Sequence, residues 1–502
     1  MEIKISGVEA GFEQAVRHVV RLFYDEPGIR FEGEGAGPPP AAGGAERRPA
    51  SGMPPGETEI RIGLPDGTVL ADRWSPPADR DERRRGLLRR VLRLLEAHTG
   101  LRQPWGILTG VRPTKLAHRK RRAGIPRDEA SRQLAEETLI VPEKIELLQS
   151  IVDRQLEALP DLYSLDREVS VYIGIPFCPT KCAYCTFPAY AIGGRQGAVD
   201  EFLESLHYEM RTVGRWLRDN GVAVTTVYFG GGTPTSITAG QLDALLGELH
   251  EAFPLERMRE VTVEAGRPDT ITREKLTVLK KWDVSRISIN PQSYIQETLR
   301  AIGRHHTVEE TIEKFRLARE MGMDNINMDL IIGLPGETAA SLAHSLAETG
   351  KLMPESLTIH TLSFKRASDM TRNREKYPVA GRDEIAAMME LATAWCAEHG
   401  YAPYYLYRQK NILGNLENVG YCLPGKESLY NIIIMEEVQT IVGLGSGASS
   451  KWVNPATGEI GRSANPKEPK AYAGNVRAAA EAKLAALEAL FGEKARSGAS
   501  AV

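Results

Sequence analysis

The stretch Tyr172-Ile-Gly-Ile-Pro-Phe-Cys178-Pro-Thr-Lys-Cys182-Ala-Tyr184-Cys185 decides how this chain of 502 residues is interpreted. A short apolar run leads directly into three cysteines with C-x3-C-x2-C spacing on one loop. Thiolates grouped in this way hold soft metals, and four would close a zinc site or saturate an iron–sulfur cube. Three leave one iron of a 4Fe-4S cluster open to a further ligand. The alternative is a structural zinc site with its fourth ligand elsewhere.

Short apolar runs alternate with amphipathic stretches from Val169 onward. Helical stretches such as Ala239–Ala252, Glu309–Gly322 and Ala339–Lys351 separate the apolar runs. The predicted strands are Val169–Ile175, Val224–Phe229, Glu260–Glu264, Val284–Ile289, Ile326–Ile332 and Ser356–Leu362. Six strand–helix units imply a parallel sheet covered by helices. An open doubly wound sheet and a partial β/α barrel would both give this local pattern.

Chemically distinctive residues follow the predicted strands at their carboxyl ends. The cysteine loop follows the first strand, Gly230-Gly-Gly232 follows the second, and Glu264 ends the third. Gln292 follows the fourth strand, and Asp329 lies late in the fifth. Reactive groups in β/α barrels lie on this face, so we expect these motifs to open onto one site.

Each motif also has a purely structural interpretation. The three glycines suit a tight strand-to-helix turn, and no Walker lysine follows them to make a phosphate loop. Tyr172 has the period of a buried strand aromatic, and Glu264 is placed to cap a turn. Arg304 and Asp329 have the character of a structural ion pair. The concentration of the motifs on one expected face favours function.

Two groups of motifs resemble a known family. Tyr172–Cys178 and Gly230–Pro234 are similar to the oxygen-independent coproporphyrinogen III oxidase group of the radical S-adenosylmethionine (SAM) superfamily. Leu108–Lys115 and Asn327–Gly336 resemble its HemZ-type branch. The resemblance runs from about residue 105 to about residue 455 and favours the partial barrel over the open sheet.

The resemblance implies a cofactor set and the residues that hold it. Cys178, Cys182 and Cys185 would bind a 4Fe-4S cluster, and no catalytic residue is assigned beyond the cluster and SAM contacts. One SAM, possibly joined by a second, would bind the remaining matched positions. The residues expected to contact a first SAM are Tyr172, Gly231, Gly232, Thr233 and Glu264. The Tyr184 ring would stack on a ligand. The second SAM would be surrounded by Gln292, Arg304 and Asp329.

The activity implied is the oxidative decarboxylation of coproporphyrinogen III propionates to vinyl groups, which gives protoporphyrinogen IX. The implied partners are a tetrapyrrole substrate and a one-electron reductant such as flavodoxin or ferredoxin.

Phe187 stands where some members of the group carry a fourth cysteine, two residues after the third. A haem chaperone of the same barrel family, or a radical SAM enzyme acting on another substrate such as RNA, are the alternatives.

The expected fold class is α/β, a partial (β/α)6 radical SAM barrel with a small N-terminal α/β domain, a helical connector and a C-terminal α/β extension. Length alone favours more than one domain. The predicted segments are 1–75 with a mobile loop at 32–56, a basic helical connector at 76–165, the barrel at 166–365, a substrate-side domain at 366–475, and a helix and tail at 476–502.

Composition describes an ordinary globular protein, with 42% hydrophobic and 26% charged residues and a net charge of −3. No signal peptide or apolar run of membrane-spanning length is present, and five cysteines do not make a disulfide framework, so we expect a reducing cytoplasm. The segment from Arg80 to Arg127 contains fifteen Lys or Arg residues and only three acidic residues. A solvated helix face is the plain explanation of this segment, and a surface for an anionic substrate or partner, or for nucleic acid, is the alternative.

Overall fold

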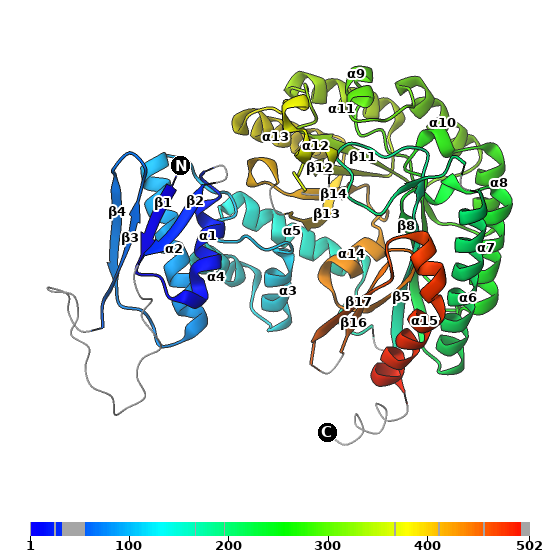
Figure 1. Ribbon diagram of the computed structural model, residues 1–502, viewed down its shortest axis with the longest axis horizontal. Coiled ribbons are helices and arrows are strands. Elements are labelled where there is room, and N and C mark those ends of the chain that lie inside the picture. The colour runs from blue at the N-terminus through cyan, green and yellow to red at the C-terminus, as the bar shows by residue number, and fades with distance from the viewer. Residues whose placement is uncertain are drawn as a thin grey trace. The chain divides into compact units, whose positions relative to one another are not determined.

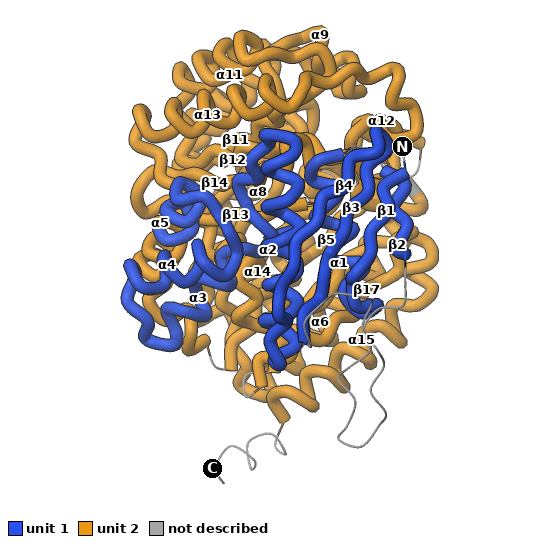
Figure 2. Tube along the Cα trace, turned by 90° about the vertical axis from the view of Figure 1, so that its left-hand side faces the viewer, with its two compact units in different colours: residues 1–149 blue, residues 150–502 orange. Residues whose placement is uncertain are grey.

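The computed structural model describes residues 2–24, 27–32, 56–165, 167–194, 196–365, 368–409, 412–454 and 457–492. The chain divides into two compact units, residues 1–149 and 150–502 (Figure 2). Most of the loop expected at 32–56, and the last ten residues of the expected tail, lie outside the described residues. The five-segment domain division remains a proposal.

The first unit contains a four-stranded sheet in the order β2-β1-β3-β4. β1 pairs parallel with β2 and antiparallel with β3, and β3 and β4 form the predicted hairpin around Pro65–Gly67. One hydrophobic core joins Ile5 and Ile62 of the sheet to Val16 of α1 and Leu88 of α2. The bounds are β1 Glu2–Ser6, α1 Glu13–Val20, β2 Gly28–Glu32, β3 Thr58–Gly63, β4 Val69–Trp74, α2 Arg80–Thr99, α3 Thr114–Arg122 and α4 Arg127–Thr138.

The second unit is built on one sheet of eleven strands. Six strands run parallel in chain order, and each lies within a few residues of a predicted one. Their side chains are largely buried, as expected of parallel strands covered by helices. These strands are β5 Glu168–Ile175, β8 Ala223–Gly231, β9 Glu260–Glu264, β10 Arg286–Ser288, β11 Ile326–Ile332 and β12 Ser356–Thr361.

Helices follow the parallel strands and lie along the outside of the curved sheet (Figure 1). Local signals start them: Thr238 caps α7 by accepting from the Gln241 N–H at 3.2 Å, and the Gln241 side chain accepts from the Thr238 N–H at 3.0 Å. The helices from residue 142 onward are α5 Pro142–Ala158, α6 Gln196–Asp219, α7 Ala239–Ala252, α8 Arg273–Lys281, α9 Gln296–Ala301, α10 Val308–Glu320, α11 Ala339–Leu352, α12 Asp369–Arg372, α13 Arg382–Glu398, α14 Leu429–Glu436 and α15 Pro469–Phe491. Of these, α5 precedes the first parallel strand, and α14 packs on the inner face of the sheet, where the Tyr430 ring stacks on that of Tyr228.

The C-terminal part of the chain extends the sheet at both edges. β13 Ala402–Tyr407 and β14 Asn418–Cys422 add antiparallel strands beside β12. β15 Thr440–Gly445 pairs parallel with β5 and is followed by the antiparallel strands β16 Ser449–Val453 and β17 Ile460–Ala464. The expected C-terminal α/β extension is therefore present. Among the described residues, no helix combines the length and the apolar character needed to cross a membrane.

The sequence from Met435 to Ser450 suggests a helix followed by a glycine-rich turn, and that interpretation is wrong. Only its first residues end α14, and Thr440–Gly445 form a buried strand, β15. The glycines permit close packing instead of a turn, because a Cβ on Gly443 would lie 2.7 Å from the backbone of Ser449.

A buried ion pair fixes the end of β15. Glu209 of α6 is fully buried and accepts from the Gly445 N–H at 2.8 Å and from Tyr472 Oη at 2.6 Å. Lys483 of α15 donates to the same carboxylate at 2.8 Å and to Asn465 Oδ1 at 2.6 Å. The carboxylate therefore joins α6, α15 and β15 through one set of satisfied hydrogen bonds.

We predict that Lys483→Met lowers the free energy of unfolding by about 3–5 kcal/mol, because it leaves the Glu209 charge buried without its counter-ion. Arg273→Ala is the control. It removes an ion pair to Glu320 whose side chains are 55% and 63% exposed, and should cost less than about 1 kcal/mol. Urea denaturation of both variants measures the difference; similar midpoints would contradict a structural role for the buried pair.

Candidate functional site

The three cysteines lie on the loop that follows β5. Cys178 ends the short strand β6 (Phe177–Cys178), which pairs with β7 (Tyr190–Ala191), so the loop between them is closed at its base. The Ala183 N–H donates to the Ile302 carbonyl at 2.9 Å, and the Ala183 carbonyl accepts from the Met370 N–H at 3.1 Å. The loop is therefore anchored to segments that follow β10 and β12.

The glycine-rich segment after β8 packs directly against the start of the cysteine loop. The Thr233 N–H donates to the Phe177 carbonyl at 2.7 Å, and Thr233 Oγ1 lies 3.3 Å from Cys178 Sγ. A Cβ on Gly232 would lie 2.5 Å from the Phe177 carbonyl oxygen, and Gly231 has a φ of +106°. This segment therefore needs glycine for close approach and for backbone conformation.

Arg267, which the sequence analysis missed, secures the middle of the loop. Its side chain is buried and donates to the Thr180 carbonyl at 3.2 Å and to Thr180 Oγ1 at 3.0 Å. Asp269 accepts from the other guanidinium nitrogens at 3.0 and 2.9 Å. Because Thr180 lies between the first two cysteines, this bidentate pair fixes the loop from the β9 side.

The loop offers the donor set of an iron–sulfur cluster. Burial raises the pKa of Cys178 to about 11 and also raises that of Cys185, and the Cys182 thiol adds to both shifts. Bound iron would reverse these shifts by stabilising the thiolates. The described residues contain no group of three Cys, His, Asp or Glu side chains at the distances of a formed metal site. The fit therefore rests on donor chemistry and on proximity within one loop.

Glu264 faces the inside of the sheet from the end of β9. Its Oε1 accepts from Tyr228 Oη at 2.5 Å, and the rings of Tyr172, Tyr228 and Tyr430 pack against one another with centroids 4.5–6.4 Å apart. Burial raises the pKa of Glu264 to about 7, and the charge of Asp329 adds to the shift. A carboxyl group held in this way, beside stacked rings, suits a ligand that carries hydrogen-bond donors and a planar base.

Asp329 is the centre of a polar group on the neighbouring strands. Its carboxylate accepts from Asn327 Nδ2 at 2.7 Å and lies 3.5 Å from His360 Nε2. His360 Nδ1 is 3.1 Å from Tyr407 Oη. Burial alone would raise the pKa of Asp329, but His360, Asn327 and the charge of Arg286 hold it below its usual value. Asp329 therefore remains ionised inside the sheet.

Gln292 and Arg304 lie close to this strand edge. The Gln292 N–H donates to the Asp329 carbonyl at 2.9 Å, and Gln292 has a left-handed φ of +67°. Arg304 is buried and donates to the carbonyls of Asn290 at 3.0 Å and Gly266 at 2.6 Å. A direct Arg304–Asp329 ion pair, the structural alternative, is absent among the described residues. Arg304 instead bridges the loops after β9 and β10.

Tyr184 packs on the hydrophobic cluster that includes Ile302, Ile331 and Met370. Burial raises its pKa, with Cys182 adding to the shift and Arg304 opposing it. The ring therefore lies between the cysteine loop and Arg304, beside the predicted second SAM position.

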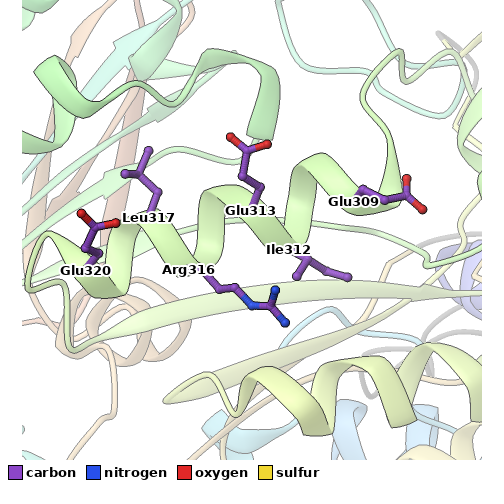
Figure 3. Close-up of a pocket in the computed structure, with 6 residues that line it drawn as sticks. All are labelled: Glu309, Ile312, Glu313, Arg316, Leu317 and Glu320. Atoms are coloured by element: carbon purple, nitrogen blue, oxygen red, sulfur yellow. The ribbon is translucent and has the colours of Figure 1, made fainter.

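The structure brings Glu264, Gln292 and the cysteine and glycine motifs to the carboxyl ends of β5 and β8–β10, whereas Tyr172 and Asp329 lie in the middle of β5 and β11. Asp329 was expected late in its strand and is the fourth of seven residues. Sequence analysis missed Arg267, Arg286, His360, Tyr407 and Tyr430, which contact or surround these residues. Only the Arg267-Pro-Asp269 sequence after β9 gave a signal. A separate hollow along α10 (Figure 3) is lined by none of these side chains; its lining is Glu309, Ile312, Glu313, Arg316, Leu317 and Glu320.

Known proteins share the sequence pattern and the fold of this chain. The Radical SAM superfamily domain matches residues 172–348. A Bacillus subtilis protein described as oxygen-independent coproporphyrinogen-III oxidase-like protein HemZ is 56% identical over 507 residues, which cover 98% of this chain and 99% of the relative. The heme chaperone HemW of the same bacterium is 32% identical over 284 residues, which cover 56% of this chain and 70% of its own.

A solved structure shares the fold. It is that of the coproporphyrinogen III oxidase HemN from Escherichia coli, a radical SAM enzyme, and it matches with a TM-score of 0.51 at 23% identity. The match covers 65% of this chain and 72% of that one. The expected α/β fold with a radical SAM barrel is therefore confirmed.

We predict that Gly232→Ala lowers the iron and sulfide content of anaerobically reconstituted protein severalfold, because the new Cβ would displace the backbone at Phe177. Gly240→Ala in α7 is the matched control, since a Cβ there meets no atom within 4 Å. Iron and sulfide assays on both variants test this prediction. Equal iron in the two would show that the close approach at Gly232 does not support the loop.

We predict that Glu264→Gln changes how stability depends on pH. The pKa of Glu264 rises from 4.5 to about 7 on folding, so the folded chain binds this proton more tightly and loses stability as pH rises through that interval. The variant lacks this loss and should gain about 1–3 kcal/mol over wild type between about pH 5 and pH 8. The free energy of unfolding, measured by denaturant at the two ends of this pH range, gives the difference between variant and wild type. The control is Glu274→Gln, because Glu274 is exposed. Parallel pH profiles for Glu264→Gln and wild type would contradict the assignment.

Proposed function

This chain belongs to the family of HemZ oxidase-like radical SAM proteins, and from that premise we propose that it is an oxygen-independent coproporphyrinogen III dehydrogenase. Membership brings a 4Fe-4S cluster and SAM as cofactors. The proposed reaction converts propionate side chains of coproporphyrinogen III to vinyl groups and gives protoporphyrinogen IX. Each conversion removes one hydrogen atom, one CO2 and one further electron, which a one-electron acceptor must take up.

The observation that supports this proposal is the approach of the cysteine loop to the carboxyl ends of the barrel strands. Thr233 and Arg267 hold the loop from β8 and β9, while Glu264 and Asp329 present carboxyl groups from β9 and β11. The cluster and SAM together supply a 5′-deoxyadenosyl radical when bound. The protein must hold the substrate hydrogen close to that radical and exclude other hydrogen donors.

We assign the cluster to Cys178, Cys182 and Cys185. Glu264 would accept hydrogen bonds from SAM, and the Gly231–Gly232 segment, which packs against the backbone at Ile175 and Phe177, would border the ligand. The matched positions imply that Tyr172, Thr233 and the Tyr184 ring also contact this site, and that Gln292, Arg304 and Asp329 border a second SAM. The carbonyls that Arg304 already bonds, on the loops after β9 and β10, would keep its guanidinium in a fixed position for that role.

The hydrophobic cluster under Tyr184 supports the radical chemistry. Leu299, Ile302, Ile331 and Met370 pack beside the loop, and Tyr184 packs against them. This apolar packing would exclude water from one side of the loop, as radical chemistry requires. Residues 366–475 would form the substrate side of the site, a tetrapyrrole would be the substrate, and a flavodoxin or ferredoxin in the cytoplasm would supply the electron.

Haem delivery is the second candidate, because HemW chaperones match more than half of this chain. The chaperone relatives resemble this chain in the cluster loop but are described by a different role. In the chaperone, the resemblance places a histidine soon after the cluster loop, whereas here Ala189-Tyr-Ala-Ile192 follows it. This difference favours the dehydrogenase.

We predict that anaerobic protein supplied with SAM, coproporphyrinogen III and a flavodoxin reducing system forms 5′-deoxyadenosine, CO2 and protoporphyrinogen IX. It should hold about four irons per chain. Cys182→Ala should lose both iron and activity. Asp329→Asn should keep its iron and lose tetrapyrrole turnover, with thermal melting used to check the fold.

Product analysis by chromatography decides between the two candidates. Protoporphyrinogen IX that depends on Cys182 supports the dehydrogenase. Cleavage of SAM without any decarboxylated tetrapyrrole, together with tight haem binding, would replace the dehydrogenase with the chaperone. Stable zinc without iron would contradict both.

A further inference from the structure

A recess of about 380 Å³ opens beside the cysteine loop. Cys182 itself lines it, so one predicted cluster ligand borders the recess directly. The other walls come from the end of α9 at Arg300, from the turn after it at Gly303, and from α12 at Arg372. A protein that contacted this recess would therefore come close to a predicted cluster ligand.

The recess carries cationic side chains. Lys181, Arg300 and Arg372 line it and are exposed, against one carboxylate, that of Asp369. That carboxylate already accepts from Tyr377 Oη at 2.8 Å and from Asn373 Nδ2 at 2.8 Å. The chain as a whole has a net charge of −3, so this local excess of positive charge is a feature of the recess and not of the average surface.

The recess is separated from the SAM-facing residues. Ala183 is fixed by its two backbone hydrogen bonds to Ile302 and Met370, and both of those side chains belong to the hydrophobic cluster on which Tyr184 packs. Glu264 and Asp329, in contrast, project from strands inside the sheet. An anionic partner in the recess would therefore approach the cluster without occupying the position of SAM.

We propose that this recess is the docking surface for a small acidic one-electron carrier protein of the flavodoxin or ferredoxin class. The inference rests on the proposed function, because only a redox-active cluster needs such a partner. The reduced carrier gives up one electron and the cluster accepts it, and no bond is formed or broken. Opposite charge on the two surfaces steers the encounter and raises the association rate by about 10- to 1,000-fold at low ionic strength.

Charge reversal at the recess tests this surface. Lys181→Glu, Arg300→Glu and the double variant keep all three cysteines and the Arg267–Thr180 contacts. Rapid-mixing absorbance then follows cluster reduction by a reduced acidic flavodoxin at low salt. We expect each single variant to slow this step and the double variant to slow it about tenfold or more, with the difference from wild type shrinking at high salt.

Two controls separate docking from damage to the cluster. Arg316→Glu reverses one exposed charge on α10 and should leave the flavodoxin rate unchanged. Reduction by dithionite, which needs no docked protein, should proceed equally in all variants with equal iron content. Unchanged flavodoxin rates in the double variant, equal slowing in Arg316→Glu, or equal slowing with dithionite would each overturn the proposal.

The readout does not depend on the tetrapyrrole reaction. Cluster reduction is observed directly, so a chain that binds iron but fails to decarboxylate coproporphyrinogen III still gives a decisive result. The proposal of a docking surface is therefore tested by the rate of cluster reduction, and the proposal of the substrate is tested separately by product analysis.

Discussion

The backbone hydrogen bond from the Thr233 N–H to the Phe177 carbonyl, 2.7 Å long, is the contact on which the site depends. It ties the loop after β5 to the loop after β8, and the missing side chain at Gly232 makes room for it. Cys178 follows Phe177 directly, so this contact sets the starting position of all three thiols. Arg267 and the Ala183 backbone fix the rest of the loop at two further points. A cluster with only three protein ligands leaves one iron open, and a rigid loop determines where that iron faces.

The C-terminal part of the chain supports the same loop from the other side. β15 extends the sheet beside β5, and the buried Glu209 accepts from the N–H of its last residue. Tyr430, which precedes β15, completes a cluster of rings with Tyr172 and with Tyr228, whose hydroxyl donates to Glu264. The wall of the site is therefore assembled from segments more than 250 residues apart, and a stable C-terminal extension is a condition for a well-placed Glu264.

Sequence patterns predicted the six parallel strands and the face on which the motifs meet, because buried parallel strands are continuous apolar runs and reactive residues follow their ends. β15 was missed because Gly443 and Gly445 suggest a turn. Their actual role is close packing, since a Cβ on Gly445 would lie 2.2 Å from the Gly174 carbonyl oxygen. Arg267 was missed because its function depends on Thr180, which lies 87 residues earlier in the chain. Contacts of this kind have no periodic signal in a sequence.

The most direct test of the account concerns the open iron. Pulsed electron paramagnetic resonance of the reconstituted and reduced protein, with SAM labelled isotopically in its methionine carboxylate, reports whether that group binds the cluster. The account predicts a hyperfine coupling between the label and the cluster, which disappears in Cys182→Ala along with the cluster signal. A cluster whose spectrum does not change when labelled SAM is added would contradict it, because the fourth iron would then be closed by a ligand from the protein.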